Sequence, residues 1–432
     1  IYEVNIRQYS PEGTFNAFTK DIPQLKELGV KIIWVMPIFP ISQTKRKATG
    51  GDDNKFASEM PKEEQHKYLG SYYAVSDFKK VNPEFGTIED FRNLVKTAHE
   101  NGMYVILDWV PNHTGWDHVW TKSHPEYYVH DADGSFHRAS GMDDIIELDY
   151  KNPEMRLAMI DAMKYWVKET NIDGFRCDLA SWVEVDFWQQ ARPEVEKIKP
   201  LFFLGEFDEL ENPDYGKVFD ASYSWSWMHK TEDFYKKKLP LTELTDLLAK
   251  YSAIGGNSMR AWFTSNHDEN SWNGTEYEKY GEMAKPLAVF SATWDGVPLM
   301  YSGQELPLLN KRLEFFEKDP IPWNGSYKLE EFYKKLYELK SKNPALRGGD
   351  TNSITKILQT NAPDKVLAYL RKNGDDEVLV ILNLSETQHL KLQILDDAVK
   401  GKYKSLFSGL TTDFDTKPTI EMYKWEHLVF EK

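Results

Sequence analysis

Gly174-Phe175-Arg176-Cys177-Asp178 ends a short apolar run that begins at Ile172, and this run predicts a buried strand. Side chains alternate along an extended strand, so Arg176 and Asp178 point to the same face. A guanidinium beside a carboxylate keeps that carboxylate ionised and oriented, as a nucleophile requires. The same residues also fit an ordinary salt bridge at a strand end. The rest of the chain has to decide between the two interpretations.

Apolar runs and amphipathic segments alternate along most of the chain around this stretch. The runs predict strands at 2–6, 30–36, 103–110, 172–178, 201–205, 218–221, 260–264 and 298–301. Helical periodicity predicts helices at 14–28, 87–101, 153–170, 186–197, 242–251, 277–290 and 329–342. This alternation predicts the α/β class and a (β/α)8 TIM barrel.

The alternation of apolar runs and amphipathic segments is interrupted at two places. Residues 114–150, after the third predicted strand, are irregular and rich in Trp, His, Asp and Gly. Beyond Pro344, short strand-like runs broken by turn residues predict an antiparallel β domain; they are 365–371, 377–384, 389–395, 403–407 and 426–430. We therefore predict a barrel made of residues 1–113 and 151–345, a short irregular domain B at 114–150, and a C-terminal antiparallel β-sandwich domain at 346–432.

Composition limits the classes of function. The 432 residues include 53 Lys plus Arg against 68 Asp plus Glu, a formal net charge of −15, and such an acidic surface argues against a nucleic-acid partner. No run of about 18 apolar residues occurs, so no membrane span is expected. The aromatic content of 14% fits sugar binding, although a large barrel also buries many rings. The single cysteine, Cys177, excludes an internal disulfide.

Polar residues gather where the predicted strands end. In barrel enzymes the catalytic groups stand at the carboxyl ends of the strands, so the side chains at these ends are expected to meet at one mouth. The residues at these positions are Asp108, His113, Arg176, Asp178, Glu206, His267 and Asp268. Each of them alone would more often be structural, but their shared placement favours a catalytic site.

At these residues the chain resembles the α-amylase family, glycoside hydrolase family 13. The resemblance is carried by four blocks in the order that the family has: Asp108-Trp109-Val110-Pro111-Asn112-His113, Gly174-Phe175-Arg176-Cys177-Asp178, Gly205-Glu206 and Phe263-Thr264-Ser265-Asn266-His267-Asp268. The family architecture, a barrel with domain B after strand three and a C-terminal β domain, would cover essentially the whole chain.

The resemblance implies a role for each residue of the site. It makes Asp178 the nucleophile, Glu206 the general acid and base, and Asp268 the stabiliser of the transition state. Glycosidic bonds break through an oxocarbenium-like state, which needs one ionised and one protonated carboxyl group. Glu206 follows an apolar run, where desolvation and nearby negative charge raise the pKa of an acid. The resemblance also implies that four residues bind the substrate: Tyr73, His113, Arg176 and His267.

Two of these assignments have neighbours that compete with them. Tyr72 lies next to Tyr73, and the four-residue step to Asp77 favours Tyr73 as the tyrosine that stacks on the sugar ring in this family. Asp108 is expected to be a supporting hydrogen-bond acceptor and not a direct contact to the sugar.

The chain departs from the family at its metal and specificity positions. Asn112 and Glu147 fall where many members hold a structural calcium, but Glu147 replaces the usual Asp. Calcium is therefore a minor expectation, the metal is unknown, and no organic cofactor is expected. Ser181-Trp182 replaces a Lys-His pair, and about twenty residues, 48–68, are inserted beside the expected mouth. We expect this insertion to shape one end of the substrate cleft.

The sequence thus favours a retaining α-glucan hydrolase that cleaves α-1,4-glucosidic bonds in starch or malto-oligosaccharides. The enzymatic alternatives are an exo-acting α-glucosidase and an α-glucan transglycosylase. A non-catalytic sugar-binding member is disfavoured because all three carboxylates are present. The expected partner is the α-glucan substrate. Endo or exo action, chain-length and branch preference, and oligomeric state stay open, and an extracytoplasmic location, periplasmic or secreted, is slightly favoured over a cytoplasmic one.

Overall fold

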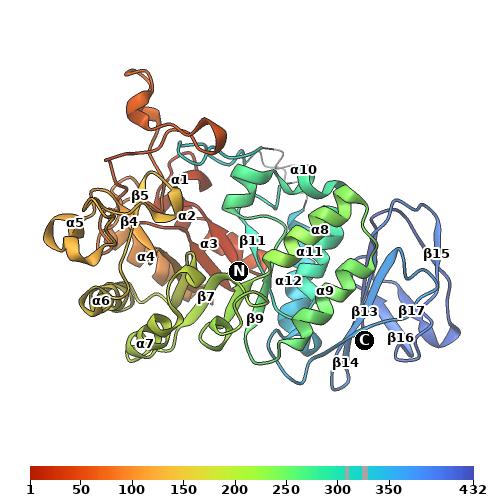
Figure 1. Cartoon of the computed structure of the whole chain (residues 1–432). Coiled ribbons are helices and arrows are strands. Elements are labelled where there is room, and N and C mark those ends of the chain that lie inside the picture. The colour runs from red at the N-terminus through yellow and green to blue at the C-terminus, as the bar shows by residue number, and fades with distance from the viewer. Residues whose placement is uncertain (307–310, 324–328) are drawn as a thin grey trace.

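The centre of the protein is a parallel sheet that curls into a nearly closed barrel (Figure 1). The computed structural model describes residues 1–306, 311–323 and 329–432, and the predicted barrel segment 151–345 contains both gaps. Within these ranges the strand order is β10-β9-β8-β7-β6-β3-β2-β1-β11. The strands are β1 (Tyr2–Val4), β2 (Ile32–Val35), β3 (Tyr104–Trp109), β6 (Gly174–Cys177), β7 (Phe202–Asp208), β8 (Ala221–Tyr223), β9 (Met259–Trp262), β10 (Val297–Pro298) and β11 (Met300–Tyr301).

One short segment closes the barrel. Pro298 of β10 pairs with Trp262 of β9, and Met300 of β11 pairs with Tyr2 of β1, so a single residue separates the two ladders. β10 and β11 are therefore two halves of the eighth strand position. The predicted TIM barrel is confirmed, with parallel pairing throughout the described part of this sheet.

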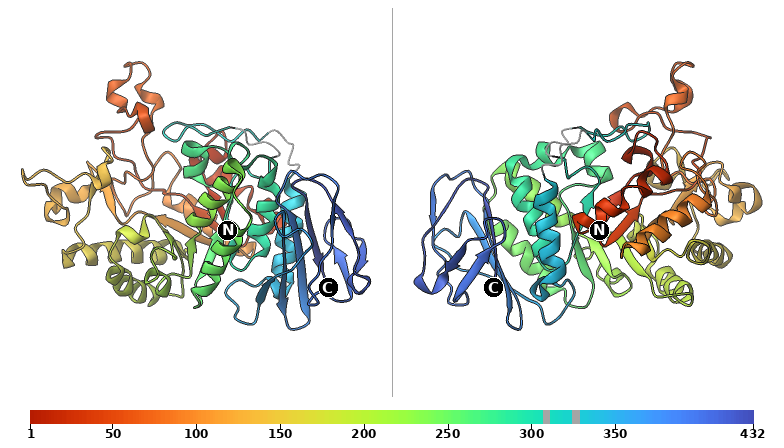
Figure 2. Two further views of the ribbon diagram at one scale, coloured as in Figure 1. Left: turned by 45° about the vertical axis from the view of Figure 1, so that its right-hand side comes forward. Right: turned by 180° about the vertical axis from the view of Figure 1, so that it is seen from behind.

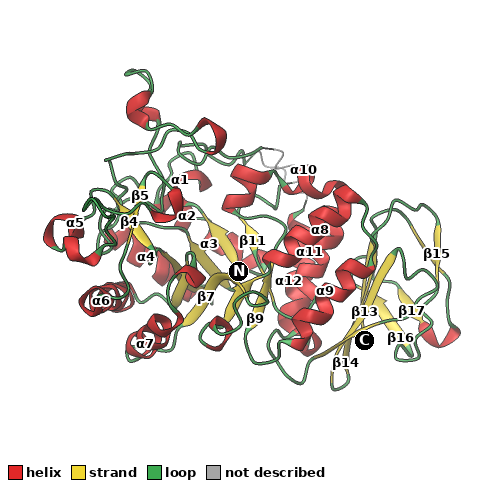
Figure 3. Cartoon of the chain, viewed as in Figure 1, coloured by secondary structure: helices red, strands yellow, loops and turns green. Residues whose placement is uncertain are grey.

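Helices cover the outside of the barrel (Figure 3). They are α1 (Ile6–Tyr9), α2 (Phe15–Thr19), α3 (Ile22–Leu28), α4 (Ile88–Glu100), α6 (Pro153–Thr170), α7 (Val185–Glu196), α8 (Trp225–Lys237), α9 (Thr242–Ala253), α10 (Glu276–Tyr280), α11 (Ala284–Thr293) and α12 (Glu330–Lys342). Their apolar faces pack on the strands; Trp166 of α6, for example, is fully buried. Among the described helices, none is both long and apolar enough to cross a membrane.

Several predicted elements differ in the structure. The expected helix 277–290 is two helices, α10 and α11. The expected helix 14–28 is two helices, α2 and α3, because Pro23 lies in the first turn of a new helix, where its missing N–H costs nothing. The sixth strand, expected at 218–221, is Ala221–Tyr223. This three-residue strand is too short for its apolar pattern to fix its ends.

Domain B follows β3. It contains α5 (Val119–Ser123) and a small antiparallel pair, β4 (His113–Gly115) and β5 (Ile145–Glu147), in which His113 pairs with Glu147. The pair holds the ends of the excursion together next to the barrel mouth.

The C-terminal part is made of antiparallel strands on one side of the barrel helices (Figure 2). Two sheets, of six and two described strands, enclose a core that includes Leu379, Tyr403 and Met422. Tyr369 joins this domain to α11 through an edge contact with Trp294, with ring centroids 4.9 Å apart. The boundaries at 113, 150 and 345 stay predictions. The strands are β12 (Ile354–Ile357), β13 (Val366–Asn373), β14 (Asp376–Asn383), β15 (Leu390–Leu392), β16 (Lys402–Ser405), β17 (Thr411–Asp413), β18 (Ile420–Met422) and β19 (His427–Glu431).

Candidate active site

A cavity of about 630 Å³ opens at the mouth of the barrel, where the carboxyl ends of the strands meet. Its wall contains six of the seven residues that the sequence singles out as catalytic or substrate-binding: Tyr73, His113, Asp178, Glu206, His267 and Asp268. The seventh, Arg176, is fully buried beneath them. Parallel strands bring these residues together although they are far apart in the sequence.

Arg176 binds three carboxylates at the floor of the cavity. Its Nη1 donates to Asp178 Oδ1 at 2.9 Å and to Asp108 Oδ1 at 3.0 Å. Its Nη2 lies 3.0 Å from Glu206 Oε2. The guanidinium also lies over the Trp34 ring, 4.7 Å from its centroid. One buried cation therefore fixes Asp178 and Glu206 relative to each other.

Asp108 supports the cavity from below. Its Oδ2 accepts hydrogen bonds from Trp34 Nε1 and from the Tyr73 hydroxyl, both at 3.0 Å, in addition to the bond from Arg176. The side chain is fully buried and is not among the described residues that line the cavity. The hydrogen-bond donors to Asp108 are the side chains of Trp34, Tyr73 and Arg176. Asp108 therefore orients Arg176 and Tyr73.

The carboxyl groups of Asp178 and Glu206 both have raised pKa values. Burial raises the pKa of Asp178 to about 6, although the Arg176 charge opposes the shift. Burial raises the pKa of Glu206 to about 7, again against Arg176, while the Asp178 and Asp268 charges add to the shift. Glu206 Oε2 also accepts from the backbone N–H of Leu179 at 2.8 Å. Of the two groups, Glu206 is the one that keeps its proton to higher pH.

His267 is held as a cation by its neighbours. Its Nδ1 hydrogen-bonds to Glu3, and its Nε2 lies 2.9 Å from the Tyr73 hydroxyl and 3.4 Å from Asp268 Oδ2. Burial lowers the pKa of His267, but the charges of Asp268 and Glu3 outweigh it and raise the pKa to about 9. The protonated Nε2 therefore donates to Tyr73, whose own proton goes to Asp108.

His113 is neutral in contrast to His267. Burial lowers the pKa of His113 to about 4. The amide nitrogen of Asn112 lies 3.1 Å from His113 Nδ1 and can only donate, so the neutral ring carries its proton on Nε2. The cavity thus has one charged and one neutral imidazole on its wall.

The two neighbouring tyrosines point to different places. Tyr73 lines the cavity, and its ring stacks on His267 with centroids 5.5 Å apart. Tyr72 is buried, with the Arg7 guanidinium 4.3 Å from its ring centroid. Only Tyr73 of this pair is therefore placed to meet a ligand in the cavity.

The side chains at the expected calcium position, Asn112 and Glu147, each contact a histidine. The Asn112 amide nitrogen faces His113, and the Glu147 carboxylate lies 3.7 Å from His137 Nε2. A calcium ion needs six to eight oxygen ligands. Among the described residues, no group of three or more His, Cys, Asp or Glu side chains could hold a metal. Calcium at this position stays a prediction, and no step below uses a metal.

Several residues of the cavity wall had no motif to mark them. The insertion contributes Gly50, Gly51 and Asn54, and aromatic rings come from other loops; they are Trp182, Trp272, Phe315 and Phe316. The Asn54 amide donates to Asp143 Oδ2 of domain B at 3.0 Å. The insertion and domain B thus meet over the cavity. Trp182 stands where a Lys-His pair is usual; for the other three rings the high aromatic content was the only signal in the sequence.

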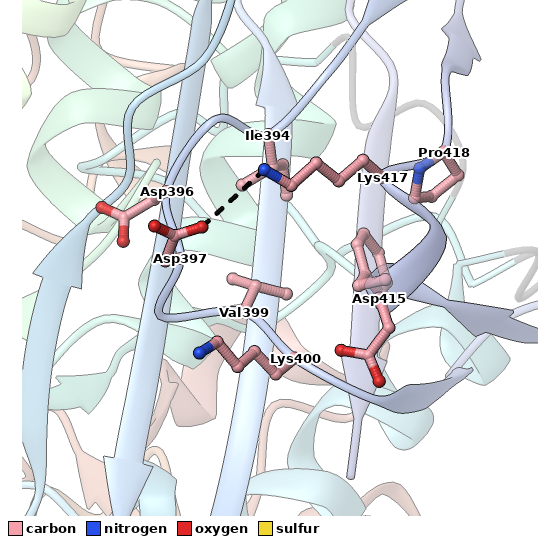
Figure 4. Close-up of a pocket in the computed structure, with 9 residues that line it drawn as sticks. Ile394, Asp396, Asp397, Val399, Lys400, Asp415, Lys417 and Pro418 are labelled. Atoms are coloured by element: carbon pink, nitrogen blue, oxygen red, sulfur yellow. Dashed lines mark ion pairs between the residues drawn. The ribbon is translucent and has the colours of Figure 1, made fainter.

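A smaller hollow of about 170 Å³ in the C-terminal domain lacks such an arrangement (Figure 4). Ile394 and Val399 contribute its apolar surface, and charged side chains surround it. Lys417 Nζ and Asp397 Oδ1 form an ion pair of 3.9 Å across it. The barrel mouth is therefore the better candidate for an active site.

Sequence comparison with protein families agrees with this geometry. The family described as "Alpha amylase, catalytic domain" matches residues 5–133 and 126–353. The family described as "Alpha amylase, C-terminal all-beta domain" matches residues 357–424. The chain belongs to the α-amylase family. This family is glycoside hydrolase family 13, so the resemblance seen in the four blocks is confirmed and the protein is a glycoside hydrolase.

Relatives within the α-amylase family are distant in sequence and close in fold. "Alpha-amylase 2" of Dictyoglomus thermophilum is 25% identical, over 92% of this chain and 67% of that protein. "Cyclomaltodextrin glucanotransferase" of Geobacillus stearothermophilus is 27% identical, over 94% of this chain and 59% of that protein. The crystal structure of the maltogenic alpha-amylase AmyB from Thermotoga neapolitana superposes with a TM-score of 0.85 at 28% identity, covering 100% of this chain and 97% of that one.

Proposed function

We propose that this α-amylase family protein hydrolyses α-1,4-glucosidic bonds in starch or malto-oligosaccharides with net retention of configuration. The observation that carries the proposal is the contact of one guanidinium, that of Arg176, with both Asp178 and Glu206. It favours the short separation, about 5 Å, that a double displacement needs between the nucleophile and the acid.

The first half of the reaction forms a covalent glycosyl-enzyme. Asp178, ionised beside Arg176, attacks the anomeric carbon, and the bond to the leaving oxygen breaks as Glu206 gives that oxygen its proton. Asp268 is 38% exposed at the cavity wall, where it can bind ring hydroxyls more tightly as positive charge develops on the sugar. In the second half, Glu206 takes a proton from water. The water oxygen attacks the anomeric carbon from the face that the leaving group left and displaces Asp178 from the opposite face, so the configuration is retained.

The remaining polar groups suit a neutral sugar. His113 and Tyr73 lie on the same wall as the carboxylates; the Nε2–H of His113 can donate to a sugar hydroxyl, and the Tyr73 oxygen can accept from one. The flat Tyr73 ring offers an apolar face for the sugar ring. Relatives named maltogenic alpha-amylase and cyclomaltodextrinase support an α-glucan as the substrate class.

The stereochemistry of the first product tests the function. Proton NMR of a fresh digest of maltopentaose should show the α-anomer of the new reducing end first and the β-anomer only after mutarotation. Glu206→Gln serves as the control for contaminating activity. A β-anomer that appears first, or no cleavage of any malto-oligosaccharide, would contradict the proposal.

We further propose that the insertion, 48–68, closes one end of the substrate cleft. It lines the cavity, it reaches domain B through Asn54, and it has a small apolar cluster of its own made by Ala48, Ala57 and Tyr68. The Arg46 side chain lies next to Gly70, so residues that flank the insertion come near each other.

Deletion of residues 48–68 should change the products released from maltoheptaose. We expect the ratio of short to long products early in a time course to shift by at least about twofold. Without this wall of the cleft, maltoheptaose can bind in additional positions relative to the catalytic residues. The substitutions Lys62→Ala and Glu63→Ala, at exposed positions of the same segment, are the matched controls. An unchanged product pattern in the deletion variant would contradict the proposed role of the insertion.

A further inference from the structure

A second groove, of about 640 Å³, lies on the seam between the barrel helices and the C-terminal domain. Among the described residues, it shares no lining side chain with the cavity at the barrel mouth. Tyr277 of α10 and Phe332 of α12 line it from the barrel side. Tyr423 and Trp425, in the turn between β18 and β19, line it from the other side. Aromatic rings of two domains therefore face one groove.

The turn that carries Tyr423 and Trp425 is held in place by three hydrogen bonds. Asn383, which is fully buried, donates from its amide to the Tyr423 carbonyl at 2.7 Å. The Trp425 N–H donates to the Ser385 carbonyl at 3.2 Å, and the Tyr423 N–H donates to Glu426 Oε2 at 2.7 Å. The two rings are thus presented on a fixed support.

Trp425 has a backbone conformation that bulky residues avoid. Its φ is +53°, in the left-handed region where glycine is at ease and a large side chain is strained. Strain of this kind persists where the surrounding structure enforces it, and it gathers at ligand-binding positions. The backbone conformation at position 425 disfavours a tryptophan, yet the tryptophan present there places its ring in the groove.

The groove is lined by charges of both signs. Lys424 Nζ lies 2.7 Å from Glu282 Oε2, an ion pair that crosses from the C-terminal domain to the barrel. Lys285 lies over the Phe332 ring, 5.2 Å from its centroid. The mixture of acidic and basic side chains supplies hydrogen-bonding groups without a large excess of one charge. This combination of flat rings and polar rim suits a neutral polyhydroxylated chain better than an ion or a lipid.

We propose that this groove is a second binding site for an α-glucan chain, held against Trp425 and Tyr423, separate from the site of cleavage. The proposal rests on the proposed function for its choice of ligand. The volume of the groove is close to that of the barrel-mouth cavity, so it can hold a few sugar rings. Figure 1 shows α10, which borders the groove, at the same end of the barrel as the insertion, so a long polymer could reach both sites.

Binding to amylopectin tests the second site in the full-length protein. Glu206→Gln slows hydrolysis enough for a binding measurement, and this variant is run through native gels that contain increasing amylopectin. We expect Trp425→Gly in this background to bind about five- to tenfold more weakly, the effect of one lost aromatic contact. Glycine removes the ring and accepts the left-handed backbone. The active-site contribution to retardation is common to all the variants and cancels in the comparison.

The controls separate this site from the cleavage site. Tyr104→Ala, at an exposed residue that begins β3 on the opposite end of the barrel, should bind as the parent does. In the active background, Trp425→Gly should keep its kcat/KM on maltotriose and lose rate only on polymer. Tyr423→Ala is the second probe if Trp425→Gly changes the melting temperature.

Two results would overturn the second site. One is a parent protein that amylopectin does not retard, and the other is parent-like retardation of both groove variants. Neither result touches the cleavage chemistry, which the anomer experiment tests by itself.

Discussion

The substitution Asp178→Asn should lower kcat on malto-oligosaccharides by about four orders of magnitude, because an amide cannot form the glycosyl-enzyme ester. The protein should stay folded, since Arg176 keeps its contacts with Asp108 and Glu206. Steady-state kinetics on maltopentaose measures the loss, and a urea unfolding curve checks the fold.

Glu206→Gln should differ from Asp178→Asn in its response to the leaving group. We expect a loss of about 10²- to 10⁴-fold on malto-oligosaccharides, whose leaving oxygen needs a proton. On α-maltosyl fluoride, whose leaving group needs little help, the glycosylation step of Glu206→Gln should lose far less. Asp178→Asn should lose on both substrates. Equal behaviour of the two variants would contradict the division of roles between nucleophile and acid.

The pH profile provides a second measure of the same division. Activity requires Asp178 ionised and Glu206 protonated, so the rate should rise through the lower pKa, about 6, and fall through the higher one, about 7. Asp178 and Glu206 titrate as a coupled pair. The two limbs of the pH profile therefore give apparent pKa values of the pair and not of either residue alone. In Glu206→Gln, the fall above the optimum should disappear on the fluoride substrate.

The fold could be predicted from the sequence because its signals are local. The barrel strands are largely buried on both faces and are therefore mostly apolar, as in residues 105–107 of β3. The sixth strand was misplaced because Ala221–Tyr223 is short and flanked by polar residues. That error hid Tyr223, whose hydroxyl accepts from Arg176 Nη2 at 3.0 Å.

The cavity residues at the strand ends could also be named in advance, but their states could not. The charge on His267 depends on Glu3, which is 264 positions away and lies in a strand whose other two residues are Tyr2 and Val4. A lone carboxylate in an apolar strand was the signal that could have been noticed. The wall made by the insertion and by Trp272 depends on how loops pack, and periodicity says nothing about that.

Arg176→Ala should cost stability as well as activity. The side chain is fully buried and touches Asp108, Asp178 and Glu206, so its removal leaves buried carboxylates without a counter-charge. Breaking a buried ion pair by removing one partner costs about 3–5 kcal/mol. The control is Arg92→Ala, which breaks the partly exposed ion pair between Arg92 of α4 and Glu169 of α6 and should cost at most about 1 kcal/mol.

The loss caused by Arg176→Ala should grow as the pH rises. Without the cation, burial alone acts on the three carboxyl groups and moves their pKa values further above those in the unfolded chain, about 4. Groups with a higher pKa in the folded state bind more protons there, so their contribution to stability is present at low pH and is lost as pH increases. Urea unfolding of Arg176→Ala at pH 5 and at pH 8 should therefore give the smaller free energy of unfolding at pH 8, relative to wild type at the same pH. A loss within about 1 kcal/mol of that of Arg92→Ala, equal at both pH values, would show that Arg176 does not hold the carboxylates in the way the structure implies.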